Sequence, residues 1–208
     1  MNFNFSDEQI LMQEEVRKLL DKENSVKRNR TILEGEEKFD KELWKSLVNM
    51  GLTATTIPEE YGGIGMGFLE LCVIAEELGR AIAPVPFSSS VYLATTCLLN
   101  STNDELKKEY LPKLANGETI GTLAHSEKTT FPSESGISVS FKGGKLSGKK
   151  IAVPDGDIAD FAIVTAINGK KVGLYVVNLK GEGVEINSLE TFDPSRSHAD
   201  ITFTDAEA

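Results

Sequence analysis

The pattern of hydrophobic and polar positions changes once along this chain, close to residue 118. Before that point, apolar residues recur every three or four positions, which is the spacing of amphipathic helices. Beyond it, apolar and polar residues alternate, as Ile137, Val139 and Phe141 do with the serines between them. A period of two is typical of half-buried strands. The pattern therefore predicts helices, outside the loops, in the first part and strands in nearly all of the second.

Helix start and stop signals divide the first part into five expected helices. Ser6 and Gln9 have the spacing of a capping box, and Asp40 is a favoured N-cap residue. Gly51 and Gly79 stand where two helices should end, because glycine readily adopts the left-handed conformation of a helix terminus. The expected helices follow Ser6 and Asp40, cover Phe68–Leu78, begin near Ser88–Ser90, and follow Thr102.

Helices that precede strands, rather than alternate with them, indicate segregated α and β parts instead of a βαβ sheet. The predicted fold class is therefore α+β. An N-terminal all-α bundle is expected over residues 1–117, and an antiparallel β-barrel or sandwich over residues 118–208, because closure protects short strands at their edges. Besides the alternating run above, the expected strands lie at 151–153, 161–165, 172–177, 184–186 and 201–203, with turns between them.

Composition and charge narrow the range of partners. The formal net charge of −10 argues against binding to nucleic acid or an anionic membrane surface. No apolar run approaches the roughly 20 residues of a membrane span, and the N-terminus lacks the features of a signal peptide. Cys72 and Cys97 lie among apolar residues of expected helices and should be buried free thiols. These features favour a cytoplasmic protein.

The sequence of Gly143–Lys150 nearly matches the phosphate-binding loop motif. Its last residue is a lysine where a Mg²⁺-binding serine or threonine is required, and a strand-like run follows it where a helix is needed. We therefore interpret its beginning, at Lys142–Lys145, as a hairpin turn.

Other residues with catalytic or metal-binding chemistry lack the spacing that such sites need. His125 and His198 are the only histidines, and no cysteine pair accompanies them, so no metal site is expected. The chain has no Gly-x-Ser-x-Gly motif that would support a hydrolase. Glu59 and Glu60 are adjacent in one turn rather than placed on both sides of a substrate, which favours a structural role.

Three segments carry a resemblance to a known family. They are the glycine-rich loop Ile57–Gly65, the helix end and proline-fixed stretch Glu76–Phe87, and the segment Tyr110–Glu118. In this order they resemble the N-terminal half of an acyl-CoA dehydrogenase, a family of FAD-dependent flavoenzymes. The resemblance extends over essentially the whole chain and implies the family's N-terminal helical domain followed by its middle β domain.

The resemblance implies a first flavin-contacting segment at His125-Ser126-Glu127. The family commonly carries Ala-Leu-Thr-Glu-Pro here, and the threonine hydroxyl and neighbouring backbone N–H groups bond to the flavin ring. Ser126 takes the threonine position and keeps a hydroxyl. Glu127 matches the family glutamate, whereas Lys128 replaces the proline and His125 replaces an apolar residue. From the residues alone, a polar strand end at the surface fits equally well.

The second implied flavin-contacting segment is Ala152-Val153-Pro154, where the family has Trp-Ile-Thr or similar. Ala152 lacks the stacking surface of an indole, and Pro154 lacks both a hydroxyl and an N–H group. Thr129–Gly136 replaces the family's Ala-Gly-Ser-Asp segment, which helps to hold acyl-CoA. Val153–Gly156, together with the later Asp193–Arg196, resembles divergent relatives that work as paired, unequal subunits, in which one subunit contributes only part of the flavin site.

The resemblance implies α,β-dehydrogenation of an acyl-CoA thioester with FAD as cofactor. Electrons would pass to an electron-transfer flavoprotein or similar acceptor, and a homo- or hetero-oligomer is expected. The family's catalytic carboxylate lies C-terminal to the part present, so no catalytic residue is expected here. The chain would then be a truncation or one piece of a split enzyme, and inactive alone. The alternative is a non-catalytic, dehydrogenase-like partner subunit with a structural or regulatory role.

Overall fold

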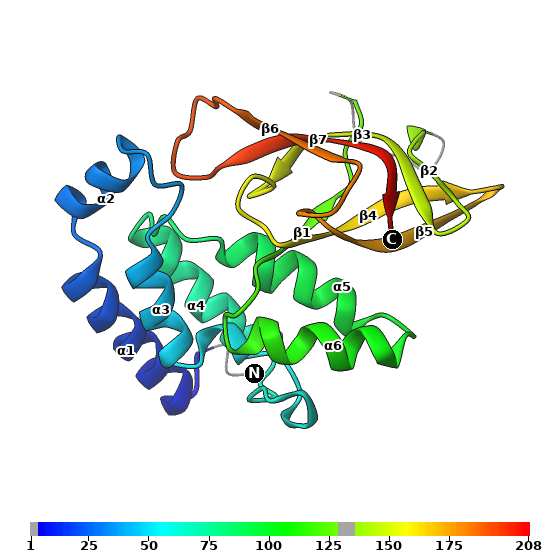
Figure 1. The fold of residues 1–208 in the computed structure, drawn as a ribbon. Coiled ribbons are helices and arrows are strands. Elements are labelled where there is room, and N and C mark those ends of the chain that lie inside the picture. Colours follow the sequence, from blue (N-terminus) through cyan, green and yellow to red (C-terminus); the bar gives the residue numbers. More distant parts are fainter. Residues whose placement is uncertain (1–3, 129–135) are drawn as a thin grey trace. The chain divides into compact units, whose positions relative to one another are not determined.

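The structure is a computed structural model that describes residues 4–128 and 136–208. Helices come first and strands follow (Figure 1), and every regular element from Gly121 onward in the described residues is a strand. The predicted α+β fold class is therefore confirmed.

The helical elements are α1 (Asp7–Glu23), α2 (Val26–Leu33), α3 (Lys41–Asn49), the short 3-10 turns η1 (Leu52–Ala54) and η2 (Glu59–Tyr61), α4 (Phe68–Arg80), the π-helix η3 (Ser88–Thr95), α5 (Thr96–Leu99) and α6 (Asp104–Ala115). The strands are β1 (Gly121–Ala124), β2 (Ser140–Lys142), β3 (Lys145–Pro154), β4 (Phe161–Asn168), β5 (Lys171–Asn178), β6 (Val184–Leu189) and β7 (His198–Glu207).

Most helix boundary signals act as predicted. Ser6 and Gln9 form the capping box at the start of α1, and Asp40 caps α3 by accepting a 3.0 Å hydrogen bond from the N–H of Leu43. Gly51 follows α3 with φ +78°, in the left-handed region. The expectation that Gly79 lies past the end of α4 is wrong, because the helix continues through it to Arg80.

The chain forms two compact units. One contains the residues up to Val85 together with Asp104–Glu118, and the other contains Pro86–Asn103 together with the residues from Thr119 onward. η3 and α5 thus pack with the strands, although their sequence pattern is helical. Helical periodicity indicates that one face of a helix is buried, but it does not identify the element that packs against this face. The division into domains at residues 1–117 and 118–208 follows secondary structure and stays a prediction.

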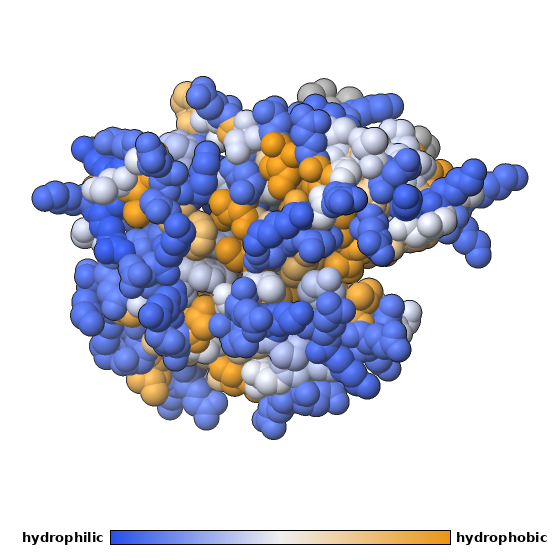
Figure 2. Space-filling model, viewed as in Figure 1, coloured by the Kyte–Doolittle hydropathy of each residue, from blue (hydrophilic) through white to orange (hydrophobic). Residues whose placement is uncertain are grey.

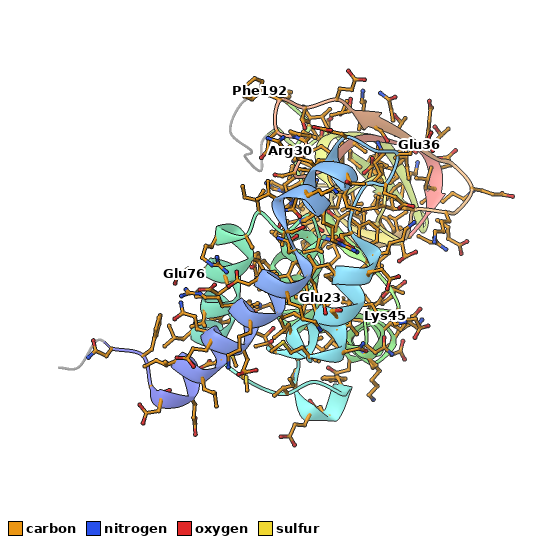
Figure 3. The ribbon with its side chains drawn as sticks, turned by 90° about the vertical axis from the view of Figure 1, so that its left-hand side faces the viewer. Glu23, Arg30, Glu36, Lys45, Glu76 and Phe192 are labelled. Carbon is orange, nitrogen blue, oxygen red and sulfur yellow. The ribbon has the colours of Figure 1, made fainter. Side chains whose placement is uncertain are left out.

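The helical unit encloses a core drawn from all of its long helices except α2. α1, α3, α4 and α6 contribute Val16, Leu20, Leu43, Leu47, Val73, Ile74, Leu111 and Leu114, each at most 2% exposed. Charged side chains such as those of Arg30, Lys45 and Glu76 lie on the exposed surface of this unit (Figure 3). Cys72 is also exposed, so the expectation of a buried thiol is wrong there.

The other unit is built on one mixed, curled sheet with the strand order β1-β4-β2-β3-β7-β6, and β5 pairs with β4 (Figure 1). β3–β7, β4–β5 and β6–β7 are antiparallel, as expected for this region. Two pairings differ from that expectation, because β1 and β2 each run parallel to β4. Residues 161–166 of β4 are all buried, as is typical of a strand that is covered on both faces.

The exposed surface is predominantly hydrophilic on the face drawn in Figure 2. In the described ranges, no helix is long and apolar enough to cross a membrane.

Candidate functional site

The two segments expected to contact a flavin lie side by side in the sheet unit. His125, Ser126 and Glu127 directly follow β1, and Ala152, Val153 and Pro154 end β3. The N–H of Ile151 donates to the carbonyl oxygen of Ser126 at 2.8 Å. The structure therefore brings all six predicted residues into one region.

A buried ammonium group joins these segments. Lys150 is fully buried, and its Nζ atom donates to Oε1 of Glu127 at 2.6 Å, to Oγ1 of Thr165 at 2.8 Å and to the carbonyl oxygen of His125 at 3.1 Å. Three acceptors match the three hydrogens of an ammonium group. Burial lowers the pKa of Lys150, and the hydrogen bond and charge of Glu127 offset part of this effect.

The carboxylate of Glu127 is bonded on both of its oxygens. Oε2 accepts from the N–H of Ser138 at 2.7 Å and from the hydroxyl of the same residue, and Val139 N–H donates to Oε1 at 3.2 Å. Burial alone would raise the pKa of Glu127, but the hydrogen bonds from Lys150 and Ser138 lower it below its ordinary value. Glu127 is therefore a buried anion that ties the end of β1 to the chain entering β2.

Sequence reasoning missed Lys150 and Thr165 as parts of this region. In the sequence, Lys150 stands out only as the residue that departs from the phosphate-binding loop motif. The available signal was its phase in β3, where the buried positions are Leu146, Lys150 and Val153. A lysine in the inward phase of a strand must have a buried partner, because an unpaired buried charge is strongly unfavourable.

The peptide groups after β1 have a defined orientation. The carbonyl oxygens of His125 and Ser126 both accept from β3 donors, and the part of the chain that the structure describes has no cis peptide bond. In a trans peptide the N–H points opposite to the C=O, so the N–H groups of Ser126 and Glu127 point away from those donors. Neither N–H group, nor the hydroxyl of Ser126, has a hydrogen-bond acceptor within residues 4–128 and 136–208. Three hydrogen-bond donors therefore lie together at the end of β1.

The β3 segment contains a bulge opposite β7, between Lys150 and Val153. Ala152 has φ +49°, and its N–H donates to Asp200 at 3.1 Å. The side chain of Ala152 is exposed, whereas Val153 is 1% exposed and contributes to the core. Pro154 is held by its carbonyl oxygen, which accepts the hydroxyl of Thr122 at 2.6 Å.

The turn after Pro154 is anchored by Asp155, which is 3% exposed. Its carboxylate accepts from the hydroxyl of Ser89 at 2.5 Å, from Nη2 of Arg196 at 3.2 Å and from the hydroxyl of Ser197 at 3.3 Å. Burial raises the pKa of Asp155. The segment Asp193–Arg196, singled out in the sequence, is thereby connected to the end of β3.

The remaining candidate motifs have simple structural roles. Residues 142–145 connect β2 and β3 as a hairpin, as predicted. Glu59 and Glu60 are exposed in η2. The described part of the chain contains no cluster of side chains that could hold a metal ion. Of the segment Thr129–Gly136, all but its last residue lies outside the described residues.

Comparison with known proteins agrees with the resemblance found in the sequence. Residues 6–118 match the family model of the acyl-CoA dehydrogenase N-terminal domain. Because this match covers more than half of the chain, the protein belongs to the acyl-CoA dehydrogenase family.

Individual relatives support the same assignment. Mitochondrial isovaleryl-CoA dehydrogenase of Pongo abelii is 35% identical over 169 residues, which is 77% of this chain but 40% of the relative. The structure of the ChsE4-ChsE5 complex from Mycobacterium tuberculosis matches with a TM-score of 0.90 at 25% identity, over 100% of this chain and 57% of that one. A glutaryl-coenzyme A dehydrogenase with glutaryl-CoA matches with a TM-score of 0.88 at 25% identity, over 100% and 56%. The chain thus spans roughly two fifths to three fifths of the length of these relatives.

Proposed function

We propose that this chain forms the helical and middle β parts of an FAD-dependent acyl-CoA dehydrogenase, which introduces an α,β double bond into an acyl-CoA thioester. The observation that carries the proposal is a group of three donors at the end of β1, beside the β3 bulge, that have no acceptor among the described residues: the Ser126 N–H, the Glu127 N–H and the Ser126 hydroxyl. A flavin ring presents nitrogen and oxygen acceptors at its edge, and such donors suit that edge.

The residues proposed to contact the flavin come from both segments. Ser126 contributes its hydroxyl and its N–H, Glu127 its N–H, and His125 the carbonyl that sets the peptide orientation. Ala152, Val153 and Pro154 form the neighbouring part of the site, with less contact area than a tryptophan would supply. The bound flavin would supply the redox chemistry by accepting a hydride.

The substrate and partners are proposed from the family. Acyl-CoA is the expected substrate, and an electron-transfer flavoprotein or similar carrier is the expected acceptor. A homo- or hetero-oligomer in the cytoplasm is the expected form. We name no catalytic residue in this chain, because the resemblance covers the family's N-terminal helical and middle β domains and assigns the carboxylate that removes the α-proton to neither.

The alternative is a non-catalytic, dehydrogenase-like partner subunit. Ala152 and Pro154 favour it, because both lack groups that the family uses at the flavin. The similarity to a chain of the ChsE4-ChsE5 complex also fits a protein that works beside a second, different chain.

Anaerobic titration with acyl-CoA tests the proposal. The protein, purified with the chain that completes it and loaded with FAD, is mixed with acyl-CoA thioesters of short, medium and branched type. Bleaching of the visible flavin absorbance by at least one thioester supports a dehydrogenase. FAD binding without bleaching by any of them favours the partner-subunit alternative, and failure to bind FAD contradicts the proposal.

A further inference from the structure

Lys150 is the one fully buried lysine among the described residues. It occupies a strand position of the kind that Leu146 and Val153 fill with apolar side chains. Replacing a buried ion pair by apolar residues is often neutral or stabilising. Packing alone therefore does not require a lysine at this position.

We propose that Lys150 is a positioning residue for the flavin, acting by fixing the peptide groups of His125–Glu127 so that their N–H groups face the ring. The inference rests on the proposed function. It concerns the orientation of donors that already exist in the backbone, and Lys150 would act through these peptide groups rather than by its own contact with the flavin.

The argument starts from the two carbonyl groups that follow β1. The carbonyl of Ser126 is held by a main-chain donor, the N–H of Ile151, at 2.8 Å. The carbonyl of His125 is held by a side chain, Nζ of Lys150, at 3.1 Å. The bond from the Ile151 N–H is kept in any variant at position 150 that preserves the strand. The bond from Lys150 Nζ is lost when the lysine is replaced.

Without the ammonium group, the Thr165 hydroxyl, at 3.4 Å, is the one side-chain donor among the described residues that the His125 carbonyl keeps. That distance is beyond the normal range for an O–H···O hydrogen bond. The peptide between His125 and Ser126 would then be free to rotate, and the Ser126 N–H would lose its fixed direction. Donors that are fixed before binding contribute most to affinity, because no ordering is needed when the ligand arrives.

The ion pair also sets the local charge. Lys150 neutralises Glu127, whose carboxylate is anchored by Ser138 and Val139 at the start of β2. With Lys150 removed, the negative charge of Glu127 would remain close to the site. A negative charge disfavours the addition of electrons to a nearby flavin, so its midpoint potential should fall.

The experiment compares Lys150→Met and Thr165→Val with the unchanged protein, each purified with the chain that completes it and loaded with FAD. Lys150→Met should weaken FAD binding about tenfold or more, equivalent to the loss of one to two hydrogen bonds. It should also shift the visible absorbance of the flavin and lower its midpoint potential. Thr165→Val, which keeps the ammonium group, should move the spectrum in the same direction by less, and it serves if Lys150→Met does not fold.

Arg17→Met is the matched control, because it breaks the ion pair of another buried carboxylate, Glu77, in the helical unit. It should lower the unfolding temperature without changing the flavin spectrum or potential. If neither Lys150→Met nor Thr165→Val changes the flavin signals of a protein that binds FAD, Lys150 has no positioning role. If the unchanged protein, purified with the chain that completes it, binds no FAD at saturating concentration, the proposed function itself fails and the inference falls with it.

Discussion

Arg17 on α1 and Glu77 on α4 are joined by a hydrogen bond of 2.9 Å from Nε to Oε2, although 60 residues separate them in the sequence. The Glu77 side chain is completely buried, and it also accepts from Nε of Arg80 at 2.8 Å. The hydrogen bond from Arg17, together with that from Arg80, lowers the pKa of Glu77 from 4.5 to about 2. The pair therefore fixes α1 against α4 by a contact whose strength depends on pH.

Acid should weaken this contact in a defined pH window. The folded pKa of Glu77 lies below the unfolded value, so its contribution is fully present above about pH 4.5 and is lost as pH falls toward 2. In urea unfolding between pH 6 and pH 2, Glu77→Gln should remove this part of the pH dependence. It should also lower the unfolding free energy at pH 7 by about 2–3 kcal/mol, because two cations lose their buried partner. An unchanged pH slope in Glu77→Gln would contradict the assignment.

Two adjacent glycines of the Ile57–Gly65 loop should differ sharply in their tolerance of alanine. A Cβ atom at Gly63 would lie 1.8 Å from the carbonyl oxygen of Ile57, whereas one at Gly62 would meet nothing within 4 Å. Gly63→Ala must displace the main chain and should destabilise the fold by roughly 3 kcal/mol or more. Gly62→Ala incurs only the strain of φ +79°, about 1–2 kcal/mol. Thermal unfolding of both variants tests this order, and equal losses would show that the clash is relieved at no cost.

Among residues His125–Glu127, substitution of the Ser126 side chain should have the largest effect on the flavin absorbance and on its reduction. Ser126→Ala leaves a flavin acceptor without a partner in a water-poor site, at about 1–3 kcal/mol. We expect a shifted flavin absorbance and slower reduction by acyl-CoA, with Ser126→Thr nearly silent. His125→Ala is the matched control, because the His125 side chain has no role in the proposed contacts. Equal effects from the two alanine variants would mean that the segment is misaligned with the family motif.

The 208-residue chain by itself should bind FAD weakly or not at all. The resemblance places contacts to the adenine half of FAD and the dimer contacts largely in the C-terminal helical domain of the family. The proposed contacts here are one hydroxyl and a few backbone groups, each contributing roughly 0.5–1.5 kcal/mol. Micromolar binding requires about 8 kcal/mol. Absorbance of the purified chain tests this prediction, and stoichiometric flavin after purification would contradict it.

The sequence pattern alone was sufficient to predict the α+β class, the capping box at Ser6, the hairpin at Lys142–Lys145 and the family. These features depend on residues close together in the chain, where period, capping and turn chemistry act directly. The sequence also singled out the segments His125–Glu127 and Ala152–Pro154, and their contact with a flavin stays a prediction.

Only the tertiary structure decided which distant groups meet. Lys150 forms an ion pair with Glu127 at a separation of 23 residues, η3 belongs to the same compact unit as the strands, and β1 runs parallel to β4. Cys72 is on the surface, although its neighbours in the sequence are apolar. The physical reason is the same in each case. Local periodicity states that a position is buried or exposed within its own element, whereas the identity of its partner depends on how elements far apart in the chain are packed together.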